Sequence, residues 1–305
     1  MANLKIQIGK VQFKNPIFVA SGTFGYGTEN PDLVDVSKLG AIFTKSITLY
    51  PREGNPPPRI VETPSGMINS IGLANIGVEN YIQNLLPEYE NIGTNIIMNI
   101  AGSSMEEYVA VLERVEGVSS PITGYEINIS CPNVKEGGME FGVDCRMTES
   151  LTSELRKRTD KLLIMKLSPN VTDIASIAIS AQNGGADAVS AINTVVGMSI
   201  DPKTQKSNIY TTFGGLSGPA IKPIGLAAVH KIFRSVHIPV IGIGGIVSSD
   251  DVVEYMLAGA TAVQVGTGNF RFPDIGLQII DNLESYFNVC KVKMSEMTGQ
   301  VIHHD

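Results

Sequence analysis

Residues 239–267 read PVIGIGGIVSSDDVVEYMLAGATAVQVGT, and this stretch contains one complete strand–helix–strand pattern. Its two short apolar runs, Pro239–Gly245 and Ala262–Thr267, are typical of parallel strands that are buried on both faces. Between them, Ser249–Ala258 predicts a helix, because acidic residues stand in its first turn and Gly259 follows its end. The stretch therefore predicts one β/α unit and the strand of the next.

The same strand pattern recurs along the rest of the chain. The eight predicted strands are Ile17–Ser21, Ala41–Ser46, Asn95–Ala101, Tyr125–Ser130, Leu162–Ser168, Ala188–Thr194, Pro239–Gly245 and Ala262–Thr267. Helices are predicted at Met105–Val115, Ser150–Thr159, Asp173–Asn183, Pro223–Ser235, Ser249–Ala258 and Pro273–Phe287. Eight such units over about 250 residues are typical of an α/β fold of the (β/α)8 TIM barrel type. A doubly wound sheet is the competing architecture, but the G-x-G-x-x-G turn that it favours is absent from the sequence.

The composition excludes several classes of protein. Hydrophobic residues make up 43% of the 305 residues and charged residues 17%, which fits a single globular domain over residues 1–305. The net charge of −7 disfavours nucleic acid as a partner. No apolar run approaches the roughly 18 residues of a membrane span, and the sequence does not start like a signal peptide. The three cysteines are too widely spaced for a disulfide framework or a zinc knuckle, so we expect a cytoplasmic protein.

Two features extend the barrel at its ends. Leu4–Ile8 and Val11–Phe13 flank a Gly-Lys turn and predict a β-hairpin, which we expect to plug the barrel floor. Three long connections, 47–80, 131–143 and 195–222, all follow the C-terminal ends of strands. Barrel active sites are built on this face, so we expect these connections to form lids or substrate walls.

Polar residues stand at the C-terminal ends of the predicted strands. A Lys or Asn in an apolar strand costs several kcal/mol unless it is paired, so five strands that carry one indicate a shared polar ligand. Glycines after the seventh and eighth strands allow backbone N–H groups to approach a phosphate, which barrels frequently bind there. The strand-end set comprises Ser21, Lys45, Ser46, Asn99, Asn128, Lys166, Asn193, Thr194, Gly244, Gly245, Gly266 and Thr267.

Flavin mononucleotide (FMN) accounts for all these groups at once. Its phosphate suits the glycines, its ribityl chain suits Ser and Asn, and its reduced ring suits Lys166 as a stabilising cation. Lys166 could alternatively form a Schiff base, as in barrel aldolases. None of the four histidines stands at a strand end, which disfavours histidine base catalysis and histidine metal sites. Glu126 lies on the same strand face as Asn128, and we expect it to pair with an interior Lys in a structural role.

One cysteine stands in a chemically suggestive place. Cys131 follows the fourth strand in the run NISCPN over residues 128–133, at the start of a glycine-containing loop on the active face. It is a candidate base or nucleophile, although a lone Cys is more commonly an inert core residue. Cys145 and Cys290 lack such a setting, and we expect both to be structural.

At NISCPN followed by VKEGGMEFG, the sequence resembles the dihydroorotate dehydrogenases. The resemblance extends over nearly the whole chain and is far more specific than any one motif. The other motifs that carry it are ASG at 20–22, TKS at 44–46, NSIGL at 69–73, NT at 193–194, GGLSG at 214–218, GIGG at 242–245 and VGT at 265–267.

The resemblance implies an FMN barrel that oxidises dihydroorotate to orotate in pyrimidine synthesis. Cys131 would be the base that removes a ring proton, while hydride passes from the adjacent carbon to the flavin. The implied orotate-binding residues are Lys45, Asn69, Ser70, Ile71, Gly72, Leu73, Asn128, Asn133, Asn193 and Thr194. The implied FMN-binding residues are Ser21, Lys45, Ser46, Asn99, Asn128, Lys166, Ile192, Gly218, Gly244, Gly245, Gly266 and Thr267.

The stretch KEGGMEFG after NISCPNV is similar to class 1B of the family. That resemblance implies a partner subunit that carries FAD and a [2Fe-2S] cluster and passes electrons to NAD. It also implies a heterotetramer of two catalytic and two electron-transfer subunits. The chain itself has neither a dinucleotide fingerprint nor a cysteine cluster for iron–sulfur, which agrees with a separate partner.

Three alternatives remain at this point. The first is another FMN-dependent pyrimidine dehydrogenase that acts on dihydrouracil, which lacks the carboxylate. The second is a class 1A-like homodimer that reduces fumarate. The third, from another class of enzyme, is a Schiff-base aldolase that uses Lys166.

Overall fold

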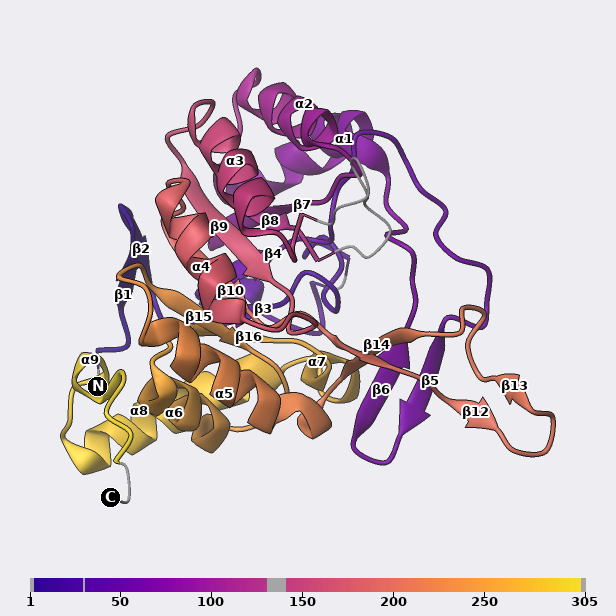
Figure 1. Cartoon of the computed structure of the whole chain (residues 1–305). Helices are drawn as coiled ribbons and strands as arrows, with labels where there is room; N and C mark the ends of the chain where they lie inside the picture. Colours follow the sequence, from indigo (N-terminus) through magenta and orange to yellow (C-terminus); the bar gives the residue numbers. More distant parts are fainter. Residues whose placement is uncertain (1–2, 30, 131–140, 303–305) are drawn as a thin grey trace.

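Eight parallel strands close into a barrel in the computed structural model, which describes residues 3–29, 31–130 and 141–302 (Figure 1). The eight predicted strands are confirmed, although most end slightly before the polar residues that follow them. The barrel closes where the last strand pairs with the first, with Val263 opposite Ile17. In chain order the barrel strands are β3 (Ile17–Val19), β4 (Ala41–Phe43), β7 (Asn95–Ile100), β8 (Ile122–Asn128), β9 (Leu162–Leu167), β10 (Ala188–Ala191), β15 (Val240–Ile243) and β16 (Ala262–Val265).

Helices surround the barrel, and each of the six predicted helices is present (Figure 1). The prediction placed the start of one of them too late: it begins at Cys145 and not at Ser150. The physical reason is the cap, because the Asp144 carboxylate accepts a hydrogen bond from the backbone N–H of Met147 at 2.9 Å. The long helices are α2 (Met105–Glu116), α3 (Cys145–Arg156), α4 (Ile174–Asn183), α5 (Lys222–Phe233), α6 (Ser249–Ala258) and α8 (Ile275–Cys290), and the short ones are α1 (Gly77–Asn80), α7 (Gly268–Arg271) and α9 (Met294–Met297).

The N-terminal hairpin plugs the floor of the barrel, as expected. Strands β1 (Ile6–Ile8) and β2 (Val11–Phe13) pair antiparallel and bury Ile8 and Phe13 among the inward-facing residues of the barrel. The rings of Phe13 and Phe18 lie 4.9 Å apart between centroids. Apolar packing therefore seals this end, and the polar site has to lie at the other.

The first and third long connections fold together into an extension sheet that the sequence did not predict. Its four strands have the order β11-β14-β6-β5, and the sheet projects from the barrel beside the small hairpin β12–β13 (Figure 1). Asn69 pairs with Gly215, so the sheet joins segments that lie far apart in the chain and give no local pattern. The strands of the sheet are β5 (Ile60–Thr63), β6 (Gly66–Asn69), β11 (Val195–Gly197) and β14 (Gly214–Ser217), and those of the hairpin are β12 (Ile200–Asp201) and β13 (Lys206–Ser207).

Candidate active site

A cavity of about 420 Å³ lies at the C-terminal ends of the barrel strands, between the barrel and the extension sheet. This volume falls within the range of small-molecule and cofactor sites. One wall is a row of residues across the four strands of the extension sheet, Ile60, Asn69, Gly215 and Val196, which all line the cavity. The first and third long connections therefore form a wall of the site, which is the role that we expected for them, whereas most of the second, 131–143, lies outside the described residues.

Most of the predicted site residues converge on this one cavity. Those that line it are Ser21, Lys45, Ser46, Asn69, Ser70, Ile71, Gly72, Leu73, Asn128, Lys166, Ile192, Asn193, Thr194, Gly218, Gly244, Gly245, Gly266 and Thr267. Asn99 is not among the lining residues, because it is fully buried one layer below the cavity. Cys131 and Asn133 lie outside the described residues.

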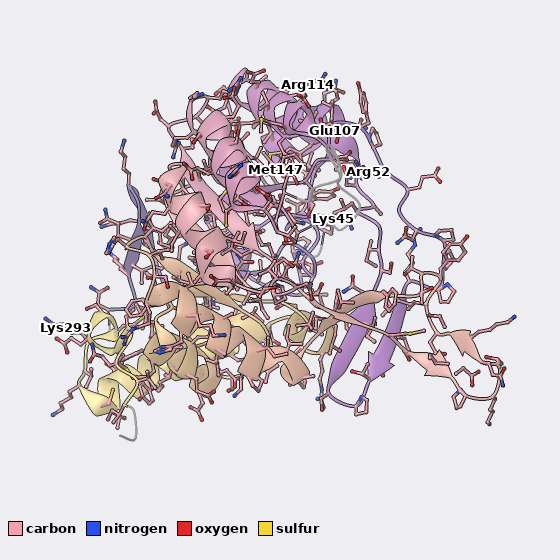
Figure 2. All side chains as sticks on the ribbon, in the orientation of Figure 1. Lys45, Arg52, Glu107, Arg114, Met147 and Lys293 are labelled. Atoms are coloured by element: carbon pink, nitrogen blue, oxygen red, sulfur yellow. The ribbon has the colours of Figure 1, made fainter. Side chains whose placement is uncertain are left out.

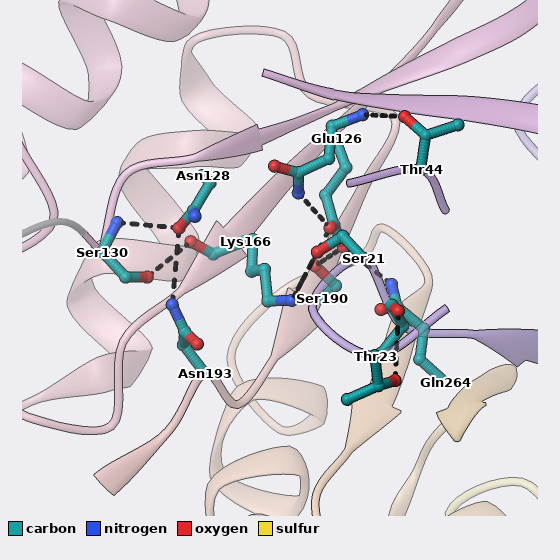
Figure 3. A network of polar contacts seen from close by, with 12 residues as sticks. Ser21, Thr23, Thr44, Glu126, Asn128, Ser130, Lys166, Ser190, Asn193 and Gln264 are labelled. Atoms are coloured by element: carbon teal, nitrogen blue, oxygen red, sulfur yellow. Dashed lines mark hydrogen bonds and ion pairs between the residues drawn. The ribbon is translucent and has the colours of Figure 1, made fainter. Parts of the chain in front are cut away.

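A buried hydrogen-bond network forms a layer between the apolar floor and the cavity (Figure 3). Its centre is Glu126, which is fully buried, and whose Oε1 accepts hydrogen bonds from Ser190 Oγ and Gln264 Nε2, each at 2.7 Å. Glu126 Oε2 accepts from Asn99 Nδ2 at 2.6 Å and lies 3.7 Å from Lys166 Nζ. The expected pairing of Glu126 with an interior Lys is confirmed.

Among the described residues, two lysines face the cavity, and their surroundings differ. Lys166 has the buried carboxylate of Glu126 beside it and donates to Ser21 Oγ at 3.4 Å. Lys45 makes no ion pair or side-chain hydrogen bond with any described residue. Burial lowers the pKa of the Lys45 ammonium below its usual 10.5, the charge of Glu29 opposes this change, and that of Arg59 adds to it. The ammonium of Lys45 is therefore available to pair with an anionic group of a ligand.

Glycines shape the part of the cavity beneath the loops after β15 and β16. Gly245 has φ +68°, and a Cβ there would lie 2.9 Å from the backbone nitrogen of Lys222, so this turn requires glycine. Gly266 differs, because a Cβ there would meet nothing closer than the Cβ of Ala20 at 3.8 Å. Similarly, a Cβ at Gly22 would meet no atom of the described residues within 4 Å. The space beside Gly22 and Gly266 is therefore not filled by any described residue and is available to a ligand.

The loop after β15 is fixed from below by a carboxylate. Asp251, in the first turn of α6, accepts hydrogen bonds from the backbone N–H groups of Val247 and Ser248 at 2.8 and 2.9 Å. Burial alone would raise the pKa of Asp251, but hydrogen bonds from Lys222, the Val247 amide and the Ser248 side chain lower it below its usual 3.8. Tyr255 also donates to the carbonyl of Gly244 at 2.8 Å. The loop is thus held in shape by the protein itself.

Amide side chains line the side of the cavity that faces the extension sheet. Asn193 Nδ2 donates to Asn128 Oδ1 at 3.4 Å, and Asn69 Nδ2 donates to the carbonyl of Gly215 at 3.3 Å. Asn55, which the sequence analysis missed, donates to Ser70 Oγ at 2.8 Å and also lines the cavity. Amides offer both donors and acceptors, so the wall suits a planar ligand with amide edges.

Sequence reasoning missed other residues of the site for a simple reason. Gln264 and Ser190 occupy inward positions of β16 and β10 below the cavity, and neither stands at a strand end. The sequence did offer one signal: each of these residues is a polar residue within an apolar strand, two positions before the residue of that strand or its loop that lines the cavity. Phe213, an exposed aromatic of the third connection, lines the mouth, and only the tertiary fold brings it there.

Other kinds of site find no support in the described residues. They contain no group of three or more His, Cys, Asp or Glu residues arranged to hold a metal ion. Cys145 begins α3 and Cys290 ends α8, where it is exposed, and neither lines the cavity. No helix among residues 3–29, 31–130 and 141–302 has the length and apolar character to cross a membrane.

Comparisons with known proteins agree with this geometry. The family model for dihydroorotate dehydrogenase matches residues 3–287. A Bacteroides fragilis protein named dihydroorotate dehydrogenase B (NAD(+)), catalytic subunit, is 48% identical over 301 residues, which cover 98% of this chain and 99% of the relative. A protein of the same name from Desulforamulus reducens is 50% identical over 284 residues, 93% of each chain.

A solved structure shows the same fold. The crystal structure of the Eimeria tenella dihydroorotate dehydrogenase in complex with ferulenol superposes with a TM-score of 0.79, at 22% identity, over 98% of this chain and 88% of that one. The family model and the relatives that match along nearly the full length show that this chain belongs to the dihydroorotate dehydrogenase family.

Proposed function

We propose that this protein oxidises dihydroorotate to orotate in pyrimidine biosynthesis and delivers the electrons, through a partner subunit, to NAD. The observation that carries the proposal is the convergence of Lys45, Lys166, the amide wall and the open glycine-lined space on one cavity. The names of the relatives, which specify an NAD(+)-linked dihydroorotate dehydrogenase, support it. They favour it over the dihydrouracil, fumarate-linked and aldolase alternatives.

The residues present fit FMN as the cofactor. None of the described residues fills the space beside Gly22 and Gly266, and a hydrogen bond from Tyr255 to Gly244 holds the neighbouring turn, which suits a phosphate site. Lys166 would lie beneath the ring system, with Ser21 and Asn128 nearby. When bound, FMN supplies a two-electron acceptor for the hydride that leaves the substrate.

The remaining residues would bind and orient the substrate. The ammonium of Lys45, which has no hydrogen-bond or ion-pair partner among the described residues, suits the carboxylate of dihydroorotate. Asn69, Asn128 and Asn193 suit the amide edges of its ring. Cys131 would accept the ring proton, a role that rests on the resemblance of the NISCPN motif alone. A thiol with an ordinary pKa near 8.5 is a weak base at neutral pH, so the rate should rise with pH until the thiol ionises.

A partner is part of the proposal, because the relatives are named catalytic subunits. We propose that this chain acts as a single FMN-binding barrel domain in the cytoplasm. In the same proposal, the partner carries FAD and a [2Fe-2S] cluster, and two copies of each subunit form a heterotetramer. These features rest on the class 1B resemblance.

The absorbance spectrum of the purified chain tests this function. We expect a yellow protein whose flavin band bleaches when dihydroorotate is added without oxygen. Dihydrouracil, which lacks the carboxylate, should bleach it far more slowly, and fumarate should not restore the colour of the reduced protein at a catalytic rate. A colourless protein that takes up no FMN, or one that prefers dihydrouracil, would contradict the proposal.

A further inference from the structure

We propose that Glu126 is a positioning residue that sets the charge beneath the bound cofactor; this inference rests on the proposed function, in which that cofactor is FMN. Glu126 does not line the cavity, but its partner Lys166 does. Glu126 therefore contacts no ligand in the cavity itself, and acts through its charge and through the position of the lysine beside it.

The Glu126 carboxylate contacts side chains from four other strands of the barrel, and Figure 3 shows Lys166, Ser190 and Gln264 around it. Asn99 on β7 and Lys166 on β9 lie 2.6 and 3.7 Å from its Oε2. Ser190 on β10 and Gln264 on β16 donate to its Oε1, each at 2.7 Å. All four partners present donors or a positive charge, which is the arrangement that a buried carboxylate anion requires.

A second observation shows how strongly this layer is organised around the carboxylate. Asn99 and Gln264 both direct their NH2 groups to Glu126, and as a result Asn99 Oδ1 and Gln264 Oε1 have no hydrogen-bond partner among the described residues. Leaving a buried carbonyl oxygen unpaired is unfavourable. The two amides are therefore oriented to donate to the carboxylate, although this orientation leaves their own oxygens without a partner among the described residues.

The pair of Glu126 and Lys166 carries no net charge, and both members are buried, with side-chain exposures of 0% and 7%. Charges interact more strongly between low-dielectric walls than in water. The carboxylate therefore offsets most of the attraction that the Lys166 ammonium would exert on a negatively charged ligand. Lys45 has no carboxylate within ion-pair distance among the described residues, and the only carboxylate whose charge acts on it is that of the more distant Glu29.

This arrangement predicts opposite effects for the two partners. Glu126→Gln keeps the size and removes the charge, so it should expose the Lys166 ammonium and favour reduced FMN, which is more negative than oxidised FMN. We expect the ratio of the affinities for reduced and oxidised FMN to rise at least tenfold, as an upward shift of the midpoint potential. Lys166→Met should shift the potential downward, and the double variant should lie between the two.

The experiment is a reductive titration of the FMN-loaded protein against a reference dye at fixed pH and salt. Glu126→Asp keeps the charge and should stay near the wild-type potential, although its shorter side chain loses contacts. Glu106→Gln, an exposed carboxylate in the first turn of α2, serves as the matched control and should have no effect. An unchanged or lower potential in Glu126→Gln, or an equal shift in Glu126→Asp, would overturn the inference.

A folding failure of Glu126→Gln leaves the inference testable. The comparison of Lys166→Met with Glu126→Gln/Lys166→Met then decides, because removal of the carboxylate must raise the potential even without the lysine. The failure of the proposed function would look different: the wild-type protein would not bind FMN at all. If the wild-type protein bleaches with dihydroorotate but the Glu126 variants keep the wild-type midpoint potential, only this inference is rejected and the proposed function stands.

Discussion

The Nζ atom of Lys222 lies 2.6 Å from Oδ1 of Asp251, and the other carboxylate oxygen of Asp251 holds the loop that follows β15. Lys222 is the first residue of α5, and its backbone packs against Gly245. One ion pair thus joins the starts of two helices to the turn at which we propose the phosphate of FMN binds. The loop is preorganised by the protein before any ligand arrives.

We expect Asp251→Asn to lower the free energy of unfolding at pH 7 by about 1.5–3 kcal/mol, because hydrogen bonds to a charged group are lost. The pKa of Asp251 in the folded protein lies below its usual 3.8, so the stabilisation is present above this pH and is lost as the pH falls through the lower, folded value. Urea unfolding of both proteins between pH 7 and pH 3 measures the difference, which should shrink only below about pH 4. A constant difference across that range would contradict the assignment.

Gly266→Ala should weaken FMN binding by about 1–3 kcal/mol and leave the stability of the FMN-free protein unchanged, because its Cβ would enter space that only the ligand occupies. Gly245→Ala is the contrasting variant. It should lower the stability of the FMN-free protein by more than about 1 kcal/mol, since its φ is +68° and the added Cβ would approach backbone atoms. Thermal unfolding without FMN and fluorescence titration with FMN separate the two effects. Equal FMN affinity in wild type and Gly266→Ala would place the ligand elsewhere.

Lys45 gives a prediction about pH. Because burial lowers the pKa of Lys45 below 10.5, its ammonium should lose its proton at a lower pH than an ordinary lysine. Orotate affinity should therefore fall as the pH rises toward 10, as the charge that attracts its carboxylate disappears. Lys45→Met should bind orotate about tenfold or more weakly at pH 7, as expected for a lost charge-assisted contact.

The control for this prediction is Lys293→Met, because Lys293 lies at the left edge of the molecule in Figure 2, well away from Lys45 near the centre of the view. It should retain the wild-type pH profile. Any pH dependence that remains in Lys45→Met comes from groups other than Lys45, including orotate itself. The difference between the wild-type and Lys45→Met profiles therefore reports the ionisation of Lys45. Parallel profiles for wild type and Lys45→Met would mean that Lys45 does not contact the carboxylate.

Cys131→Ser should slow the bleaching of FMN by dihydroorotate about 10²–10⁴-fold, the range typical of a lost general base. The colour and the affinity for FMN should remain, because the thiol is assigned to the substrate. Cys290→Ser, at the exposed end of α8, is the matched control and should bleach at the wild-type rate. Anaerobic stopped-flow absorbance measures all three proteins, and full activity of Cys131→Ser would remove Cys131 from the mechanism.

Much of the site could be predicted from the sequence, because residues at the ends of successive barrel strands lie close together in space. Lys45, Asn128, Lys166 and Gly266 each stand at or near the end of a strand, and parallel strands in a closed barrel bring those ends to one rim. Local patterns could not show which polar residues would face each other below the rim. Gln264 and Glu126 lie 138 positions apart and meet only across the barrel.

The sequence by itself determined the number and order of the barrel strands, the hairpin plug and the glycines of the β15 turn. Each of these depends on local periodicity or on the backbone freedom of single residues. Only the tertiary structure decided the extension sheet, where Asn69 pairs with Gly215, and the hydrogen bonds from Ser190 and Gln264 to Glu126. Such pairings arise from strand register and from side chains that cross the barrel interior, and no short stretch of sequence encodes either.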